Sequence, residues 1–360
     1  MKISEPLKQA STPDTLPVLQ LGLRPFYAGG ALFGSVAIAA WLAAWHGAPV
    51  AGRAASMTGL MWHVHEMIFG FVAAIVVGFL LTAVRAWTSR ETLRGTALAA
   101  LWLLWAAGRL LVWSGPEPVA AVVDSLFLPL TAIVLLRVLV AVKNRHNVFL
   151  PVALALFGGL NVLFHGYAMA GREDLALRAA YAATGLILFF VAVITGRIVP
   201  MFTTNAIPGF AIRRFRFVDA LAAPAVLLTL LADAAGVPGW TLIAAAGATA
   251  LLHAVRIAGW RSWRVGNRPI VWILHVSCLW IPAGFAMLAL SVAGVVPHSL
   301  AVHVLTVGAT LLRAFGPLVP GTPYGFWLDA SGACWIVALL AYTIHYVPIL
   351  ISPRADGRAD

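Results

Sequence analysis

The chain of 360 residues is too apolar to be a water-soluble protein. It is 61% hydrophobic and 10% charged, against roughly 25% charged residues in a typical soluble domain, and its mean hydropathy is +0.92. Lys and Arg number 24 and Asp and Glu 13, which gives a net charge of +11. This composition excludes a soluble enzyme and a disordered chain. A disulfide scaffold is excluded because both cysteines lie in apolar runs. No nucleic-acid partner is expected, since excess basic charge in a membrane protein is typical of cytoplasmic loops.

Eleven apolar runs of the sequence are long enough to cross a bilayer, which takes about 17 to 25 helical residues. They are too long and continuous for the strands of a membrane barrel, so every run is predicted to be a helix. The predicted fold class is therefore all-α, a polytopic helical membrane protein with about 11 transmembrane helices. The predicted spans are 26–46, 60–84, 95–113, 119–142, 147–170, 177–200, 217–236, 239–258, 269–294, 299–319 and 328–351.

The predicted organisation is a cytoplasmic N-terminal tail at 1–20, a single helical transmembrane domain at 21–351 and a polar C-terminal tail at 352–360. The N-terminal tail lacks the apolar core of a signal peptide. Most Lys and Arg fall on the same side of the predicted spans as this tail, which places the N-terminus in the cytoplasm. Eleven spans put the C-terminus outside, although its tail contains two arginines. One more span, or a re-entrant segment at 299–319, would remove this conflict.

Seven histidines lie inside the apolar runs, where ionisable side chains are costly and mark candidate functional sites. The predicted orientation places four of them near the outer face: His63, His65, His165 and His303. We predict that this group binds a metal, because neutral imidazole is the commonest metal ligand. Met67 lies one turn after His63 on the same helix face, and its thioether adds a ligand that favours copper(I).

His63 and His65 lie about 200° apart around a helix, so both reach one site only if the helix is unwound there. One of them is expected to bind the metal, and the other to make a supporting or interhelical contact. Glu66 is expected to fix the tautomer of a metal-binding histidine. The alternative for any single histidine is an interhelical hydrogen bond, and the alternative for Met67 is packing.

Two further histidines, His253 and His275, lie near the cytoplasmic face on spans joined by a short loop. Two imidazoles at matched depth can bind one haem between them, and Arg256 suits the haem propionates. Arg197 is predicted to belong to the same cofactor site. Cys278 shares a helix face with His275 and is an alternative ligand, although a buried cysteine is usually a small apolar residue.

Asp124 and Asp219 are acidic residues that lie in or near predicted spans. Helix-end roles are expected for both. The alternative is a proton-relay role in which each carboxylate is paired with an opposite charge.

Six sequence motifs between residues 22 and 309 form a specific combination. They are GLRPF at 22–26, WHVHEM at 62–67 with FGF at 69–71, GFLLTAV at 78–84, Gly108-Arg109, GRIVPMFTTN at 196–205 and HVLTVGA at 303–309. Together they resemble the NnrS family of bacterial polytopic membrane proteins. The resemblance implies about twelve spans, haem and copper as cofactors, and a role in nitric oxide metabolism or resistance.

The resemblance also carries the family's histidines onto five positions of this chain, whereas His165 is added from its predicted depth alone. The five positions are His63, His65, His253, His275 and His303. After Ala309 the chain departs from the family pattern, because residues 310–318 resemble the end of the family's next helix. About one span and its loop are therefore expected to be absent, which accounts for the odd number of spans.

The predicted function is that of a haem- and copper-binding protein of the bacterial inner membrane in the nitric oxide and nitrosative-stress response, linked to denitrification. Redox handling of nitric oxide or its adducts is the expected chemistry, and the electron donor is not identified by the sequence. The expected partners are the lipid bilayer and a small ligand such as nitric oxide. One alternative is a transporter or channel with a histidine-lined path. Another is a structural or signalling subunit in which polar residues only hold helices together.

Overall fold

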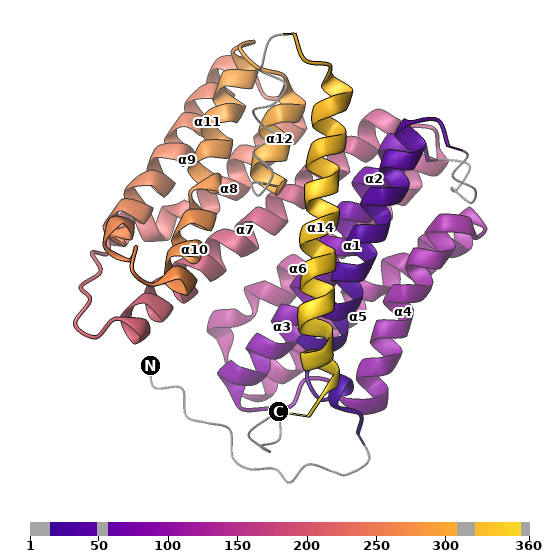
Figure 1. Ribbon diagram of the computed structural model, residues 1–360, viewed down its shortest axis with the longest axis horizontal. Helices are drawn as coiled ribbons and strands as arrows, with labels where there is room; N and C mark the ends of the chain where they lie inside the picture. The colour runs from indigo at the N-terminus through magenta and orange to yellow at the C-terminus, as the bar shows by residue number, and fades with distance from the viewer. Residues whose placement is uncertain (1–14, 49–56, 308–320, 354–360) are drawn as a thin grey trace. The chain divides into compact units, whose positions relative to one another are not determined.

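The computed structural model describes residues 15–48, 57–307 and 321–353, and within them every regular element is a helix (Figure 1). Three short 3₁₀ turns, η1 (Pro17–Leu19), η3 (Arg145–Asn147) and η4 (Ser262–Arg264), connect the longer elements. The longer elements are α1 (Leu23–Trp45), α2 (Gly59–His65), η2 (Glu66–Val72), α3 (Ala73–Thr88), α4 (Gly95–Ser114), α5 (Glu117–Ala141), α6 (Phe149–Met169), α7 (Glu173–Ala206), α8 (Arg216–Ala235), α9 (Gly239–Gly259), α10 (Pro269–Cys278), α11 (Trp280–Val292), α12 (His298–Val307) and α14 (Tyr324–Ile351).

Within the described residues, 10 helical segments are long and apolar enough to cross a membrane, which confirms the predicted polytopic helical fold. One of these spans, Gly59–Thr88, is built from α2, η2 and α3, and another, Val271–Val292, runs through α10 and α11. The predicted span at 299–319 begins as α12, and its remainder from residue 308 lies outside the described residues.

The span Gly59–Thr88 changes its winding in the middle. It begins at Thr58, whose side chain accepts a hydrogen bond from the backbone N–H of Met61 at 3.4 Å, as expected of a helix N-cap. It is α-helical to His65, π-helical through η2, and α-helical again in α3. Such π-helical turns are rare and occur most often at functional sites. The residues where this π-helical segment begins, His65 and Glu66, are therefore candidates for a functional site.

The described helices cluster into two compact units, which we call unit 1 (Met1–Ala180 with Gly332–Asp360) and unit 2 (Tyr181–Ser331). In unit 1 large aromatic side chains fill the core, and Phe26 packs edge-on against Trp105 with ring centroids 6.3 Å apart. Helix α14 packs along α1 in this unit, where a Cβ added at Gly34 would lie 2.8 Å from Leu339 (Figure 1).

Unit 2 contains most of α7 and the helices α8 to α12. Its core is mostly aliphatic, with Val226 from α8, Ala246 from α9 and Leu305 from α12 packed around Phe285 from α11. Helix α8 ends at Gly236, whose φ of 71° is left-handed and therefore easily adopted by glycine. The short turn that follows lets α9 return along α8.

Candidate metal centre

The last residue of α2 and the first of η2 begin a buried polar network in unit 1. His65 and Glu66 are 0% and 1% exposed, and the His65 Nδ1 lies 2.8 Å from Glu66 Oε1. Neighbouring residues on a regular helix point in different directions, yet these two side chains meet at the point where the winding becomes π-helical. The predicted contact between Glu66 and a histidine of this motif is present.

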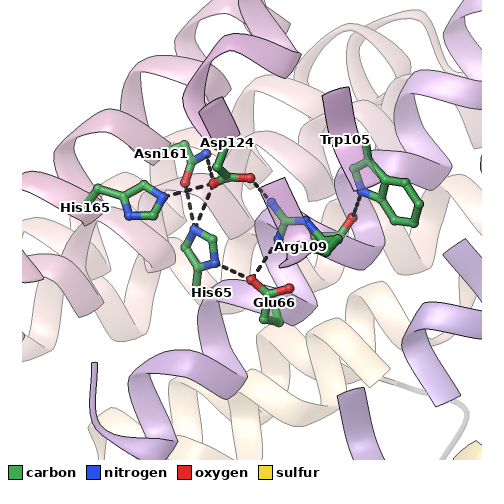
Figure 2. A network of polar contacts seen from close by, with 8 residues as sticks. His65, Glu66, Trp105, Arg109, Asp124, Asn161 and His165 are labelled. Atoms are coloured by element: carbon green, nitrogen blue, oxygen red, sulfur yellow. Dashed lines mark hydrogen bonds and ion pairs between the residues drawn. The ribbon is translucent and has the colours of Figure 1, made fainter. Parts of the chain in front are cut away.

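Arg109 of α4 connects two carboxylates from different helices. Its Nη1 donates to Glu66 Oε1 at 2.8 Å, and its Nη2 forms an ion pair with Asp124 of α5. Figure 2 shows the guanidinium lying between the two acidic side chains. Gly70 of η2 makes room for it, since a Cβ at this position would lie 2.7 Å from Arg109 Nη1. The carbonyl of Gly70 accepts a hydrogen bond from Trp105 Nε1 at 3.0 Å, which fixes α4 against η2.

Helix α6 completes the network with two residues one turn apart. Asn161 Nδ2 donates to Asp124 Oδ2 at 2.7 Å, and His165 Nε2 lies 3.0 Å from the same oxygen. Asn161 and His165 are 1% and 4% exposed. Spacing of four residues places both side chains on one face of α6. Figure 2 shows that this face is turned toward Asp124 and His65.

Both ring nitrogens of His65 face oxygen atoms that accept hydrogen bonds. Nδ1 faces Glu66, while Nε2 lies 3.0 Å from Asn161 Oδ1 and 3.2 Å from Asp124 Oδ2. The amide of Asn161 is held in this orientation because its NH₂ group donates to the Asp124 carboxylate. A neutral imidazole has a single N–H. One ring nitrogen of His65 therefore needs a cation beside it, either a proton or a metal ion.

Aromatic rings enclose the histidine end of the network. The ring of His65 lies 5.1 Å from that of Phe164, 5.3 Å from that of Phe69 and 4.7 Å from that of His165, measured between centroids. Phe69 in turn packs against Phe157 at 5.2 Å. This apolar wall keeps water away from the charged groups and so strengthens the interactions between them.

His65, Asp124 and His165 together form a group that can hold a metal ion. Their ligand atoms all lie within 4.8 Å of one another, and all three side chains are buried. Among the described residues, no second group of three or more histidine, cysteine, aspartate or glutamate side chains lies close enough together to bind one ion. Two imidazoles and a carboxylate are ligands that suit zinc, iron and copper.

The other residues of the predicted outer site have other contacts in the structure. His63 stacks on Trp41 of α1, with ring centroids 4.8 Å apart and an angle of 18° between the rings. Met67 is half-buried on η2. His303 belongs to unit 2, and its Nδ1 donates to the carbonyl of Ser299 one turn earlier at 2.6 Å. His63 and His65 thus occupy different faces of the same helix, as their spacing indicates.

In unit 2, His275 is held by two hydroxyl groups. Its Nε2 lies 2.8 Å from Thr203 Oγ1, and its Nδ1 lies 2.8 Å from Ser262 Oγ. The Thr203 hydroxyl donates to the carbonyl of Val199 at 2.7 Å. It is therefore an acceptor toward His275, so Nε2 carries the hydrogen and Nδ1 accepts from Ser262.

The remaining residues of the predicted haem site have separate partners. His253 Nε2 donates to the carbonyl of Ala222 at 3.0 Å. Arg256 donates to Asp219 Oδ1 and to the carbonyl of Ala192, each at 2.9 Å. Arg197 of α7 is half-buried. Cys278, the alternative ligand, is 2% exposed and packs in an apolar cluster with Val199, Ile257 and Trp260.

Sequence reasoning missed several members of the unit 1 network, above all Asp124, for which a helix-end role was expected. Asp124 lies within α5 and is paired with Arg109, as in the alternative interpretation. Two signals in the sequence pointed there. Opposite charges stand inside consecutive spans, and Asn161 precedes His165 by one helical turn. Trp105 gave no such signal.

Comparison with known protein families decides the assignment. The family model described as NnrS protein matches residues 17–310 and 308–354. The chain belongs to the NnrS family. The two matched segments of this NnrS-family chain overlap at residues 308–310, next to the position where the sequence predicts that about one span of the family pattern is absent. No curated protein and no solved structure matches the chain.

Proposed function

We propose that this NnrS-family membrane protein acts in the bacterial response to nitric oxide and carries copper at His65, Asp124 and His165. The observation that carries the proposal is the convergence of these three buried side chains, with ligand atoms within 4.8 Å of one another. Family membership supports the link to nitric oxide. Bound copper would supply one-electron redox chemistry and a position at which nitric oxide binds.

The surrounding residues fit such a metal. Glu66 accepts from His65 Nδ1 at 2.8 Å, which leaves the Nε2 lone pair directed at Asp124 and Asn161. Carboxylate–histidine pairs of this kind fix the tautomer of metal-binding histidines. Arg109 holds Asp124 in place and balances part of the acidic charge. The aromatic wall around His65 excludes water, so the site is reached by small neutral molecules more easily than by ions.

Haem is proposed on the strength of the resemblance alone. In the structure both nitrogens of His275 are bonded to hydroxyl groups, and the Nε2 of His253 is bonded to a backbone carbonyl. Haem ligation by His275, or by the Nε2 of His253, would require these bonds to be exchanged. As arranged, these nitrogen atoms are not available to haem iron, and no step of the proposed function depends on haem at these residues.

We further propose that the protein lies in the inner membrane with its N-terminus in the cytoplasm. The distribution of Lys and Arg among the predicted loops supports this orientation. Fusions of alkaline phosphatase and of green fluorescent protein after Ser89 and after Gly171 test it. Fluorescence after Ser89 and phosphatase activity after Gly171 are expected, and the reverse pattern would overturn the orientation.

Metal analysis of the purified protein tests the proposed copper site. We expect about one copper ion per chain in the wild type, and loss of this copper in Asp124→Asn. The matched control is Asp219→Asn, which neutralises the carboxylate paired with the buried Arg256 and should retain copper. Absence of copper from the wild type, or equal copper in both variants, would overturn the site. A pyridine haemochrome spectrum of the same samples tests haem independently.

A further inference from the structure

We propose that the metal centre of unit 1 is selective for a monovalent cation, so that it holds copper as Cu(I) and discriminates against Zn²⁺ and Cu²⁺. This inference rests on the proposed copper site and adds the charge of the ion that the site accepts. It follows from the charges of the residues around the three ligands, rather than from the ligands themselves.

The network has one unbalanced negative charge when both imidazoles are neutral, as metal-bound histidines are. Glu66 and Asp124 contribute two negative charges, and Arg109 contributes one positive charge. In the described chain, the ion pairs of these two carboxylates involve only Arg109, His65 and His165. One positive charge on the bound ion makes the network neutral, whereas a divalent ion leaves a surplus of one.

Burial makes this surplus costly. The side chains of Glu66, Arg109 and Asp124 are 1%, 5% and 2% exposed, and all three belong to segments long and apolar enough to span the membrane. A net charge in such surroundings is strongly disfavoured, because neither water nor counter-ions screen it. The neutral state is therefore favoured, and a monovalent ion provides it.

Carboxylate and imidazole ligands alone do not select a monovalent ion, since both bind Zn²⁺ and Cu²⁺ well. Arg109 supplies the selectivity, because it neutralises one of the two carboxylates in advance. Its guanidinium stays charged at any pH the protein meets. Arg109 is thus a specificity-determining residue that contacts the ligand Asp124 and lies outside the ligand set.

Competition between Ag⁺ and Zn²⁺ tests this charge selection without redox chemistry, because both ions have filled d shells. The protein for the assay carries Cys278→Ala and Cys334→Ala, so that thiols do not bind Ag⁺. Affinities are measured by competition with chelators on purified protein, and bound Cu(I) is measured in the same way under anaerobic conditions. We expect Ag⁺ and Cu(I) to bind with 1:1 stoichiometry and Zn²⁺ to bind more weakly.

Two variants change the charge of the network in opposite directions. Glu66→Gln keeps the hydrogen bonds to His65 and Arg109 but removes the unbalanced charge, so Ag⁺ and Cu(I) affinity should fall at least about tenfold. Arg109→Gln leaves two unbalanced charges, so the ratio of Ag⁺ to Zn²⁺ affinity should shift at least about tenfold toward Zn²⁺. Because the ratio in each variant is compared with the ratio in the parent protein, whose ligands are the same, the intrinsic ligand preferences of the two ions cancel. Glu66→Gln carries the test alone if Arg109→Gln does not fold.

The outcomes separate the two proposals. Failure of the wild type to bind any of these ions would overturn the copper site itself. Binding of Zn²⁺ as tight as that of Ag⁺, or an unchanged monovalent affinity in Glu66→Gln, would leave the copper site standing and overturn the charge selection. A weakened monovalent affinity in Glu66→Gln together with preserved protein folding supports it.

Discussion

The intramembrane histidines of the two units have different kinds of partner. In unit 1, His65 and His165 both lie close to one carboxylate oxygen of Asp124, at 3.2 and 3.0 Å. In unit 2, His253 is bonded to a backbone carbonyl and His275 to two hydroxyl groups, all of them uncharged. The unit 1 histidines therefore meet at a charge that a cation balances. His253 and His275 of unit 2 each form hydrogen bonds to their own uncharged partners and share none.

Arg109 of unit 1 and Arg256 of unit 2, both buried, also differ in their partners. Arg109 joins two carboxylates whose side chains are 1% and 2% exposed. Arg256 pairs with one, Asp219, whose side chain is 27% exposed and lies in the first turn of α8. A helix N-terminus stabilises a negative charge, so the ionised carboxylate of Asp219 depends less on its ion pair with Arg256. A buried network with several charges is thus expected to respond to substitution more strongly than a pair at a helix end.

Removing each arginine gives the largest expected difference between the units. Arg109→Ala leaves two buried carboxylates without their cation, and we expect it to lower the free energy of unfolding by about 3–5 kcal/mol. Arg256→Ala should cost less, because the carboxylate of Asp219 is partly exposed and has the helix dipole beside it. Unfolding of both variants in mixed detergent and dodecyl sulfate micelles measures the difference.

Arg109→Lys is the control for this comparison. It keeps the positive charge but cannot bridge two carboxylates with a rigid fork, so its stability should lie between those of wild type and Arg109→Ala. An Arg256→Ala variant less stable than Arg109→Ala would contradict the distinction between the two arginines.

Glycines that face these charged groups give the next largest effect. A Cβ at Gly108 of α4 would lie 3.1 Å from Asp124 Oδ1 and 3.2 Å from its Cα, so Gly108→Ala must move α5 away from α4. A Cβ at Gly196 of α7 would overlap the guanidinium of Arg256, which must then leave its bond to Ala192. We expect each variant to lose about 1–3 kcal/mol, as is typical of overpacking.

The control for the glycine variants is Gly247→Ala in α9, where an added Cβ meets no atom within 4 Å. Alanine has the higher helix propensity, so this variant should be as stable as the wild type or slightly more. Gly108→Ala should also reduce copper binding by displacing Asp124, while Gly196→Ala should not. Equal copper loss in both would contradict the assignment of the metal to unit 1.

The fold was largely predictable from the sequence because a bilayer constrains it strongly. Uninterrupted apolar runs have to be helices, and the predicted span 95–113 corresponds to α4 at Gly95–Ser114. The change to π-helical winding at Glu66 was not predictable, since it leaves no mark on hydropathy. The division into two units also has no signature in the length or spacing of the runs.

The candidate site was predictable only in part. The depth of His65 and His165 placed them together, because position along a span follows directly from counting residues. Counting does not tell which way a side chain faces across helices, so His63, which stacks on Trp41, was grouped with them. Asp124 was given a helix-end role and Asn161 none, because their roles depend on packing between α5 and α6.

The smallest expected effect concerns His298 at the start of α12 in unit 2, a residue outside the ten candidate spans whose partner Asp233 lies near the end of the span Arg216–Ala235. The His298 Nε2 donates to Asp233 at 3.1 Å, and this bond raises the pKa of His298 above its ordinary value of about 6.5. A raised pKa in the folded state stabilises the fold fully below about pH 6.5, and this contribution is lost as the pH rises through the raised pKa. The melting temperature should therefore fall between pH 6 and pH 8, and His298→Gln should flatten this fall.

Asp233→Asn removes the carboxylate instead and should flatten the fall equally, because the pH-dependent stabilisation needs both the histidine and the carboxylate. An unchanged slope in either variant would show that another group titrates in this range, and that the histidine–carboxylate pair adds no pH-dependent stability to unit 2.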